Sequence, residues 1–389
     1  MRRAGAASIL LLALAACGDE PGLFELDAGL PTQDFADELD RLVPELLSET
    51  GVPGVGVALI ENGQTVWMSG YGFADLASSR PVDPNSTVFQ AASISKTLVA
   101  WTVMDLAEAG LIDLDVPIET YLTRWSFPEG PFSSGAVTAR RLLSHTAGTS
   151  IWGYPGFRPG ADLPSLEQSL RGQTNGQGRV EIEVEPATRW RYSGGGFTVL
   201  QLAIEEITGQ PFADVVQARV LDPLGMASSA FVWREDLRER TATAYGEEGE
   251  ALPNFIFVAS ASGGLYSTVA DLAGLVEASL DHPGGLTRGR GIVDPETVDL
   301  MMTGPPVAVD YGLGHMLLTL NDSREVPGHA GINQGWRSFW ATDPAQGLGI
   351  VVLSNSDHTE DLPSRILCAW TRSVLGAPIA APKGILGCS

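Results

Sequence analysis

Ser93 and Lys96, in the run Ser-Ile-Ser-Lys, are the residues whose types and spacing best fit a chemical reaction. Of the 24 lysines and arginines of the chain, only two are lysines, Lys96 and Lys383. A desolvated lysine can lose its proton at neutral pH, which arginine cannot. Residues three apart lie on the same face of a helix. The pair therefore predicts a serine nucleophile and a lysine base at the start of a helix, as in one class of acyl-transfer enzymes.

Tyr192 is the second candidate, because it shortly precedes three glycines at 194–196. We predict a loop there whose backbone can approach a ligand closely. The Tyr192 phenol can relay a proton if a neighbouring cation lowers its pKa. The alternative is a packed tyrosine beside a flexible turn, and for this motif taken alone it is the better interpretation.

His329 is the third candidate, in the run Gly-His-Ala-Gly-Ile at 328–332. On an edge strand, His-x-Gly offers a side chain for orientation and a backbone N–H for an oxyanion. A histidine taken alone is more often a hydrogen-bonded structural residue. We assign no chemical role to the other four histidines, which are His145, His282, His315 and His358.

The elements that must position these residues begin with a predicted helix over 34–51. Two predicted strands, 55–63 and 64–72, are joined by an Asn-Gly pair, which is a strong hairpin signal. The helix that carries Ser93 follows them.

The middle of the chain, from about 111 to 260, reads mostly as helices and loops. Another helix is predicted over 267–280, with Ser267 as its N-cap. Three strands and a last helix follow, at 311–320, 335–343, 347–355 and 359–376. Strands at both ends with helices between them predict an α/β fold, in which the two ends of the chain build one sheet around a mostly helical insertion.

The composition is that of an ordinary globular protein of 389 residues, with 44% hydrophobic and 18% charged residues. The formal net charge of −23 argues against a nucleic-acid partner, since phosphate binding needs a basic face. The acidic residues are spread along the chain, which indicates a solvated acidic surface.

Residues 1–16 have the pattern of a signal peptide, with two arginines before a short apolar stretch at 7–16. This stretch is too short to span a bilayer. It ends in Leu-Ala-Ala-Cys, which resembles a bacterial lipobox and predicts that Cys17 is lipidated. Residues 17–35 would then be a tether, and the protein would be anchored in the bacterial cell envelope, facing the periplasm or the exterior. The alternative is a plain signal peptide with an incidental cysteine.

Cys368 and Cys388 are the cysteines that remain, and an even pair in an exported chain predicts a disulfide. This bond would tie the C-terminal tail at 376–389 to the segment before it. Neither cysteine lies in a Cys-x-x-Cys or histidine-rich setting, so we expect no metal site and no cofactor.

In their order and spacing, the three motifs resemble those of the serine β-lactamase and penicillin-binding-protein superfamily, on the branch of class C β-lactamases, D-alanyl-D-alanine carboxypeptidases and esterases. That family has Ser-x-x-Lys, then Tyr-x-Asn, then Lys- or His-x-Gly. The corresponding runs here are Ser93 to Lys96, Tyr192 to Gly194, and His329 to Gly331. The segments GYGFADL, VTARRLLSHTAG, ASGGLYSTVADLA and GHAGINQGWRS are similar too. The resemblance covers about residues 36–375 and implies one domain with an antiparallel sheet and flanking helices.

The resemblance also implies roles for the site residues. Ser93 would be the acylated nucleophile and Lys96 its base partner. Tyr192 would assist proton transfer to the leaving group. His329 and Gly331 would shape the edge of the site.

The resemblance further implies an oxyanion hole made of the backbone N–H groups of Ser93 and Ile332. The departure from the family is Gly194, where relatives usually have an asparagine that contacts the lysine and the substrate amide. Its absence predicts a smaller, looser site that recognises amides and β-lactams poorly and suits an ester.

These features predict a lipid-anchored serine hydrolase that acts through an acyl-enzyme on an ester, amide or β-lactam-like acyl donor, either a small molecule or peptide-like, with esterase activity slightly favoured. The alternative is a catalytically weak penicillin-binding module that senses or scaffolds cell-wall material. The sequence has no Gly-x-Ser-x-Gly, which disfavours an α/β-hydrolase, and no His-Glu-x-x-His, which disfavours a zinc hydrolase.

Overall fold

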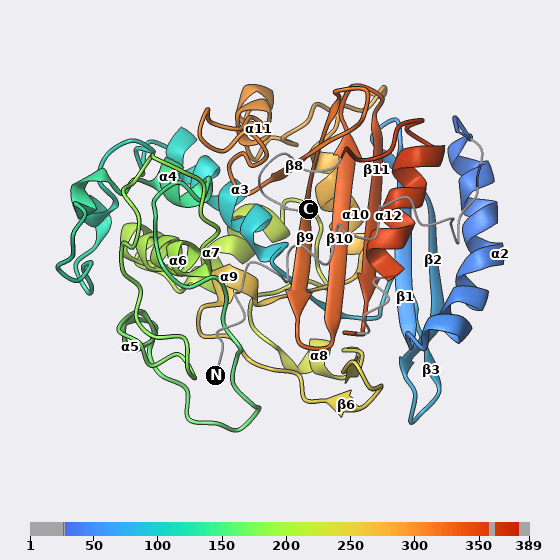
Figure 1. Cartoon of the computed structure of the whole chain (residues 1–389), viewed down its shortest axis with the longest axis horizontal. Helices are drawn as coiled ribbons and strands as arrows, with labels where there is room; N and C mark the ends of the chain where they lie inside the picture. The colour runs from blue at the N-terminus through green and yellow to red at the C-terminus, as the bar shows by residue number, and fades with distance from the viewer. Residues whose placement is uncertain (1–25, 27, 358–361, 381–389) are drawn as a thin grey trace.

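The computed structural model describes residues 26, 28–357 and 362–380. Their main element is an antiparallel sheet with the strand order β3-β2-β1-β11-β10-β9-β8. Its strands are β1 (Gly54–Glu61), β2 (Gln64–Asp75), β3 (Arg80–Pro81), β8 (Met316–Thr319), β9 (Glu325–Asn333), β10 (Trp336–Asp343) and β11 (Leu348–Ser354). Strands from both ends of the chain therefore share one sheet (Figure 1), which confirms the predicted fold.

The two ends of the chain meet where β1 pairs with β11, with Val55 opposite Ser354. The turn from β1 to β2 consists of Asn62 and Gly63, whose φ angles are 52° and 67°. Asparagine and glycine tolerate this left-handed conformation better than other residues, and it suits a two-residue hairpin. The hairpin predicted from the Asn-Gly pair is thus confirmed.

Helices cover both faces of the sheet (Figure 1). α2 (Thr32–Thr50) and α12 (Leu362–Ser373) pack on one face, and α10 (Val269–Ala278) packs on the other. Side chains of a strand point alternately to opposite faces. Val57 therefore joins the core of α2 and α12, whereas its neighbour Ala58 joins the core of α10. Because both faces are covered, β1 is an almost continuous apolar run.

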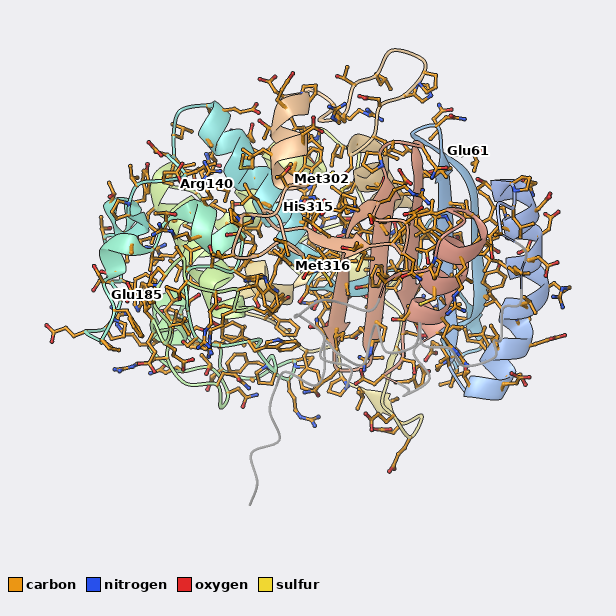
Figure 2. The ribbon with its side chains drawn as sticks, turned by 45° about the horizontal axis from the view of Figure 1, so that its top comes forward. Glu61, Arg140, Glu185, Met302, His315 and Met316 are labelled. Atoms are coloured by element: carbon orange, nitrogen blue, oxygen red, sulfur yellow. The ribbon has the colours of Figure 1, made fainter. Side chains whose placement is uncertain are left out.

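A mostly helical region lies beside the sheet, at the left of Figure 1. Side chains of the two parts meet at their boundary, where the labelled His315 and Met316 lie (Figure 2). The remaining elements, in chain order, are β4 (Phe89–Ala92), α3 (Ser95–Glu108), η1 (Ile118–Tyr121), η2 (Ser134–Ala136), α4 (Ala139–Leu143), α5 (Leu166–Leu170), α6 (Gly194–Thr208), α7 (Phe212–Val216), the π-helical turn η3 (Gln217–Leu221), α8 (Glu235–Arg238), β5 (Ala244–Tyr245), β6 (Ala251–Leu252), α9 (Ser260–Gly263), β7 (Leu265–Ser267) and α11 (Pro295–Met301).

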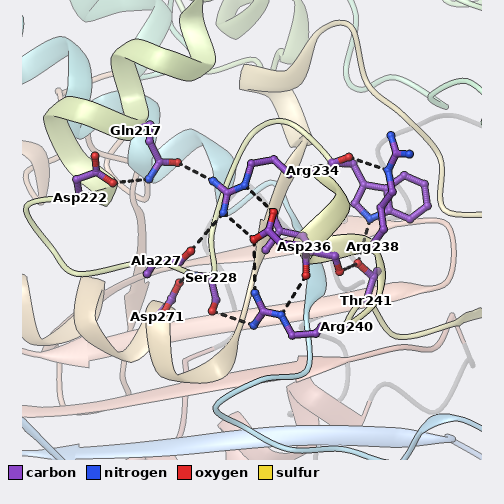
Figure 3. A network of polar contacts seen from close by, with 12 residues as sticks. Gln217, Asp222, Ala227, Ser228, Arg234, Asp236, Arg238, Arg240, Thr241 and Asp271 are labelled. Atoms are coloured by element: carbon purple, nitrogen blue, oxygen red, sulfur yellow. Dashed lines mark hydrogen bonds and ion pairs between the residues drawn. The ribbon is translucent and has the colours of Figure 1, made fainter.

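A polar network anchors the segment around α8 (Figure 3). The Arg234 guanidinium contacts the Asp236 carboxylate, and so does that of Arg240. The Arg240 carbonyl accepts the N–H of Val88 at 3.1 Å, and the Val88 carbonyl accepts the N–H of Ala242 at 2.9 Å. The network thus holds the residue that directly precedes β4, the strand that leads to Ser93.

One helix begins later than the sequence predicts. The N-cap of α10 is Thr268, whose hydroxyl accepts the N–H of Asp271 at 3.1 Å. Ser267 instead ends β7, and its hydroxyl lies 2.8 Å from that of Ser229. The predicted cap is therefore wrong by one residue, because Ser267 is held in the strand.

Cys17 and Cys388 lie outside the described residues, and Cys368 is buried in α12. The lipid anchor and the disulfide therefore stay predictions. Within the described part of the chain, no helix combines the length and the apolar character that a bilayer-spanning segment needs.

Candidate active site

Ser93 lies in the turn between β4 and α3. Ala92, the last residue of β4, has a φ of 47°, a left-handed conformation that bends the chain sharply just before the serine. The Ser93 carbonyl accepts the N–H of Lys96 at 3.0 Å, so this turn leads directly into the helix. Ser93 therefore stands just ahead of α3 rather than inside it, and Lys96 lies in the first turn of the helix.

Ser95 is the other hydroxyl close to this turn, and it is already engaged. Its Oγ donates to the Ala92 carbonyl at 2.6 Å and accepts the N–H of Leu265 at 3.0 Å. The residue is fully buried. Ser95 thus joins the turn to β7, which is a structural role.

Lys96 is buried directly behind Ser93. Its Nζ lies 3.1 Å from the Ser93 Oγ and also donates to the Ser262 carbonyl. Burial lowers the Lys96 pKa to about 7, because the charged ammonium is deprived of water. At neutral pH a substantial share of the molecules therefore holds a neutral amine against the serine hydroxyl, which is the state that a general base requires.

Tyr192 reaches Ser93 from the other side, and its phenol donates to the Ser93 Oγ at 2.9 Å. Burial raises the Tyr192 pKa, and the hydrogen bond to Ser93 offsets this only in part. The condition named above, a Tyr192 pKa lowered by a neighbouring cation, is therefore not met. The phenol keeps its proton at neutral pH and is suited to donate it.

His145 fixes the backbone on both sides of Tyr192. Its carbonyl accepts the N–H of Arg191 at 2.7 Å, and its Nδ1 accepts the N–H of Ser193 at 3.1 Å. Its ring centroid lies 4.3 Å from that of Tyr192. Burial holds the His145 pKa well below its usual value, with a smaller contribution from the charge of Lys96. Beyond the presence of a histidine, no sequence signal indicated this positioning role.

Tyr192 lies in a loop, as predicted, but Gly194 begins helix α6, so the glycine run itself is helical rather than part of the loop. Ser193 is the N-cap, and its hydroxyl accepts the N–H of Gly196 at 2.9 Å. A Cβ on Gly194 would come within 2.3 Å of the Ser262 Oγ and 3.0 Å of the Trp152 carbonyl oxygen. The space that a side chain would need is therefore filled, and the looser site expected at this position is not found.

His329 lies in the interior rather than at the edge of the site, which corrects the expectation. Its Nδ1 donates to the Ala330 carbonyl at 2.6 Å, so its Nε2 accepts from the Tyr311 hydroxyl at 2.9 Å. Burial lowers the His329 pKa to about 3, with a smaller effect of the charge of Lys96. The ring is neutral, fully enclosed, and absent from the lining of the cavity that holds Ser93.

Gly331 and Ile332 lie at the end of β9. The pairing of β8 with β9 ends at Gly328, and beyond it β9 runs beside β4. A Cβ on Gly331 would come within 2.3 Å of the Ala91 carbonyl oxygen, so a glycine is needed for this approach. Ile332 lines the same cavity as Ser93. This placement suits the expected oxyanion hole.

The cavity in front of Ser93 has a volume of about 450 Å³. Its wall includes three aromatic rings and three side-chain amides, and the sequence reasoning did not single these residues out. The signal that it overlooked is the aromatic run SIWGYPGF at 150–157, one residue after SHTAG. The wall consists of Trp152, Gly153, Tyr154, Pro155, Gln177, Glu247, Phe257, Ser262, Gly263, Ile332, Asn333, Gln334, Arg337 and Asp357, besides Ser93.

Known proteins resemble this chain over most of its length. Esterase EstB from Burkholderia gladioli is 28% identical over an alignment of 390 positions. The alignment covers 89% of this chain and 95% of the relative. Protein flp from Staphylococcus aureus (strain N315) is 23% identical over 339 residues, which cover 83% of this chain but 64% of the longer relative.

Solved structures share the fold. The octameric penicillin-binding protein homologue from Pyrococcus abyssi superimposes with a TM-score of 0.72 at 26% identity, over 87% of this chain and 77% of that one. The beta-lactamase/D-alanine carboxypeptidase from Pseudomonas syringae superimposes with a TM-score of 0.70 at 20% identity, over 88% and 99%. The Beta-lactamase family matches residues 39–367, and on that span, which contains every residue of the site described above, the chain belongs to this family.

Proposed function

We propose that the protein is a serine hydrolase that acts through an acyl-enzyme, with esterase activity ahead of β-lactamase or peptidase activity. The observation that carries this proposal is the position of the Ser93 Oγ, 3.1 Å from the Lys96 amine and 2.9 Å from the Tyr192 phenol. A hydroxyl held between a group that can take a proton and a group that can give one is the arrangement that acyl transfer needs.

In the proposed reaction, the neutral Lys96 amine accepts the Ser93 proton while the Oγ attacks the ester carbonyl. The backbone N–H groups of Ser93 and Ile332 stabilise the oxyanion. Collapse of the intermediate breaks the ester C–O bond, and the leaving alcohol takes a proton from Tyr192, which is replaced by the proton held on Lys96. Water then hydrolyses the acyl-enzyme through the same groups, which returns Ser93 to its starting state.

Two observations favour an ester over an amide or a β-lactam. Position 194 is a glycine with no room for a side chain, so the site has no asparagine there to hold a substrate amide. The relative that matches over 95% of its own length is called an esterase. The alternative, an inert penicillin-binding or cell-wall-sensing module, does not account for a buried lysine with a pKa of about 7 beside the serine.

The test is covalent labelling of Ser93. The wild-type protein is incubated with a fluorophosphonate and with a short-chain aryl ester, and intact-mass spectrometry records the adducts. We expect a single adduct, loss of it in Ser93→Ala, and retention of it in the matched variant Ser95→Ala. Circular dichroism confirms that both variants fold. Adducts that survive Ser93→Ala and disappear in Ser95→Ala would overturn the proposal.

We also propose that the chain is a lipoprotein anchored through Cys17, with a disulfide between Cys368 and Cys388. Expression with its own leader should place the protein in the membrane fraction, and Cys17→Ser should release it. Mass spectrometry of the non-reduced protein should show no free thiol at Cys368 or Cys388. Unmodified Cys17 in a soluble wild-type protein would contradict the anchor, and two free thiols would contradict the disulfide.

A further inference from the structure

The charged residues on the cavity wall suggest which acyl donors the site accepts. Among the described residues that line the cavity, the side chains of the charged types are those of Arg337, Asp357 and Glu247. Two of these charges are negative and one is positive. Lys96 is enclosed behind Ser93 and does not form part of the wall. The wall therefore carries a net negative charge.

Arg337 is the cation of this wall, and Asp357 already neutralises it. The Arg337 Nη1 contacts the Asp357 Oδ1 and also donates to the Trp336 carbonyl at 3.1 Å. Both side chains are largely buried, with 18% and 17% of their surfaces exposed. Because Asp357 already offsets the charge of Arg337, a substrate carboxylate gains little attraction from Arg337 and is repelled by the Asp357 carboxylate beside it.

Asp357 is itself held from two directions, so it cannot easily move aside. Its Oδ2 accepts the N–H of Gly335 at 2.6 Å, and its backbone N–H donates to the Tyr245 carbonyl at 2.9 Å. Burial raises the Asp357 pKa, Arg337 lowers it, and the nearby negative charge of Glu247 raises it slightly. The influence of Glu247 indicates that a second carboxylate acts on this part of the cavity.

We propose that the Arg337–Asp357 pair, together with Glu247, makes the cavity selective for acyl donors that carry no carboxylate. This inference rests on the proposed hydrolase function and specifies its substrate class as uncharged or cationic esters. The other polar groups of the wall fit such substrates, because Gln177 and Gln334 present neutral amides. β-Lactams and D-alanyl peptides carry a carboxylate close to the reacting bond, so the same pair disfavours them.

The test compares two substrates that differ in one charge, mono-p-nitrophenyl glutarate and its methyl ester. We expect the wild-type enzyme to cleave the neutral methyl ester with a kcat/KM at least about tenfold higher than that of the acid. Asp357→Asn, which keeps the shape and a hydrogen-bonding oxygen, should reduce this ratio about tenfold or more, mainly through the KM of the acid. Glu247→Gln should reduce it by a smaller factor.

The matched control is Glu38→Gln, which removes one negative charge from a surface pair with Arg41 on α2, on the far side of the sheet. It should leave the ratio unchanged, which separates a local effect from the net charge of the protein. A wild-type enzyme that cleaves both substrates equally well would overturn the inference. So would an Asp357→Asn variant that is folded by circular dichroism and keeps the wild-type ratio.

A binding measurement separates failure of this inference from failure of the proposed function. In the Ser93→Ala background neither substrate is cleaved, so calorimetry gives the Kd of each directly. The Kd of the acid should exceed that of the methyl ester about tenfold, and Asp357→Asn should remove the difference. Charge selection in binding without any cleavage by the wild-type enzyme would refute the hydrolase but support the selectivity. Cleavage of both substrates without charge selection would refute the selectivity alone.

Discussion

Lys96 and Arg337 are two cationic side chains near the same cavity, and their surroundings give them opposite properties. Lys96 is fully buried, and burial alone accounts for its pKa of about 7. Arg337 lies against Asp357 in an ion pair. A buried cation without a carboxylate partner becomes a base, whereas a cation with such a partner remains a fixed charge. Lys96 therefore serves in proton transfer, whereas Arg337, in our proposal, serves with Asp357 in selecting substrates by charge.

The largest effect is expected when Lys96 is made to resemble Arg337. Lys96→Arg keeps the positive charge but cannot act as a base, so kcat/KM for an aryl ester should fall by about 10³ or more. Initial rates measure this loss. Arg140→Lys, a swap in the opposite direction within an exposed pair with Asp115, serves as the control and should leave the rate unchanged. A Lys96→Arg enzyme with more than about a tenth of the wild-type activity would mean that Lys96 acts only through its charge.

The pH dependence of kcat/KM tests this comparison, because burial brings the pKa of Lys96 close to neutrality. Since the base must be neutral, kcat/KM should fall about tenfold per pH unit below a pKa of about 7. Tyr192 stays protonated through this range because burial raises its pKa. His329 and His145 stay neutral because burial lowers theirs. A profile that stays flat from pH 5 to pH 8, recorded with an ester stable over that range, would contradict this assignment.

Replacement of Lys96 and replacement of Arg337 should change the free energy of unfolding in opposite directions. The unfolded chain binds a proton at Lys96 below the ordinary lysine pKa of 10.5, and the folded protein binds it only below about 7. Unfolding therefore takes up a proton between these values, so this group lowers stability at neutral pH and the loss disappears as the pH rises towards 10.5.

Replacing each cation by methionine tests this difference. Lys96→Met should abolish activity yet raise the free energy of unfolding at pH 7 by about 2 kcal/mol. Arg337→Met should lower it by about 1–3 kcal/mol, because Asp357 then stays buried without its partner. Urea titrations at pH 7 measure both changes. Equal losses in the two variants would show that Lys96 is a stabilising residue like Arg337.

The sequence predicted the sheet, its hairpin and the pair of Ser93 and Lys96, because each rests on local rules. Apolar strands, an Asn-Gly turn and a Ser-x-x-Lys spacing are readable over a few residues. The pKa of Lys96 is not, since it depends on burial by segments as distant as Ser262. The position of His329 was misjudged for the same reason: the local motif suggests an exposed edge, but Tyr311 and the helical region enclose the ring.

The Arg337–Asp357 pair was equally invisible in the sequence. Its members are 20 residues apart and meet only because β10 and β11 are neighbours in the sheet. The glycine run at 194–196 was predicted to belong to a loop, but it forms the tightly packed start of a helix. In each case tertiary packing, rather than local preference, decides what the residue does.

The smallest expected effect concerns Gly194. Gly194→Asn would restore the asparagine that relatives usually have, but the new Cβ would lie 2.3 Å from the Ser262 Oγ. Gly194 has no left-handed φ, so the obstacle is not backbone strain but the Ser262 hydroxyl and, less severely, the Trp152 carbonyl oxygen at 3.0 Å. Gly194→Asn alone should therefore destabilise the protein by about 1–3 kcal/mol, as overpacked sites do.

Adding Ser262→Ala removes that hydroxyl while leaving the carbonyl that accepts from Lys96. The double variant should recover part of the stability and raise β-lactam acylation relative to ester cleavage a few-fold, since one added hydrogen bond to a substrate amide is worth about 1 kcal/mol. Ser262→Ala alone is the control and should not change that ratio. The increase in β-lactam acylation should stay small, because Asp357 still repels the carboxylate of the β-lactam. A single Gly194→Asn variant that is as stable as the wild type and acylates β-lactams faster would show that the packing around Ser262 yields more readily than its geometry indicates.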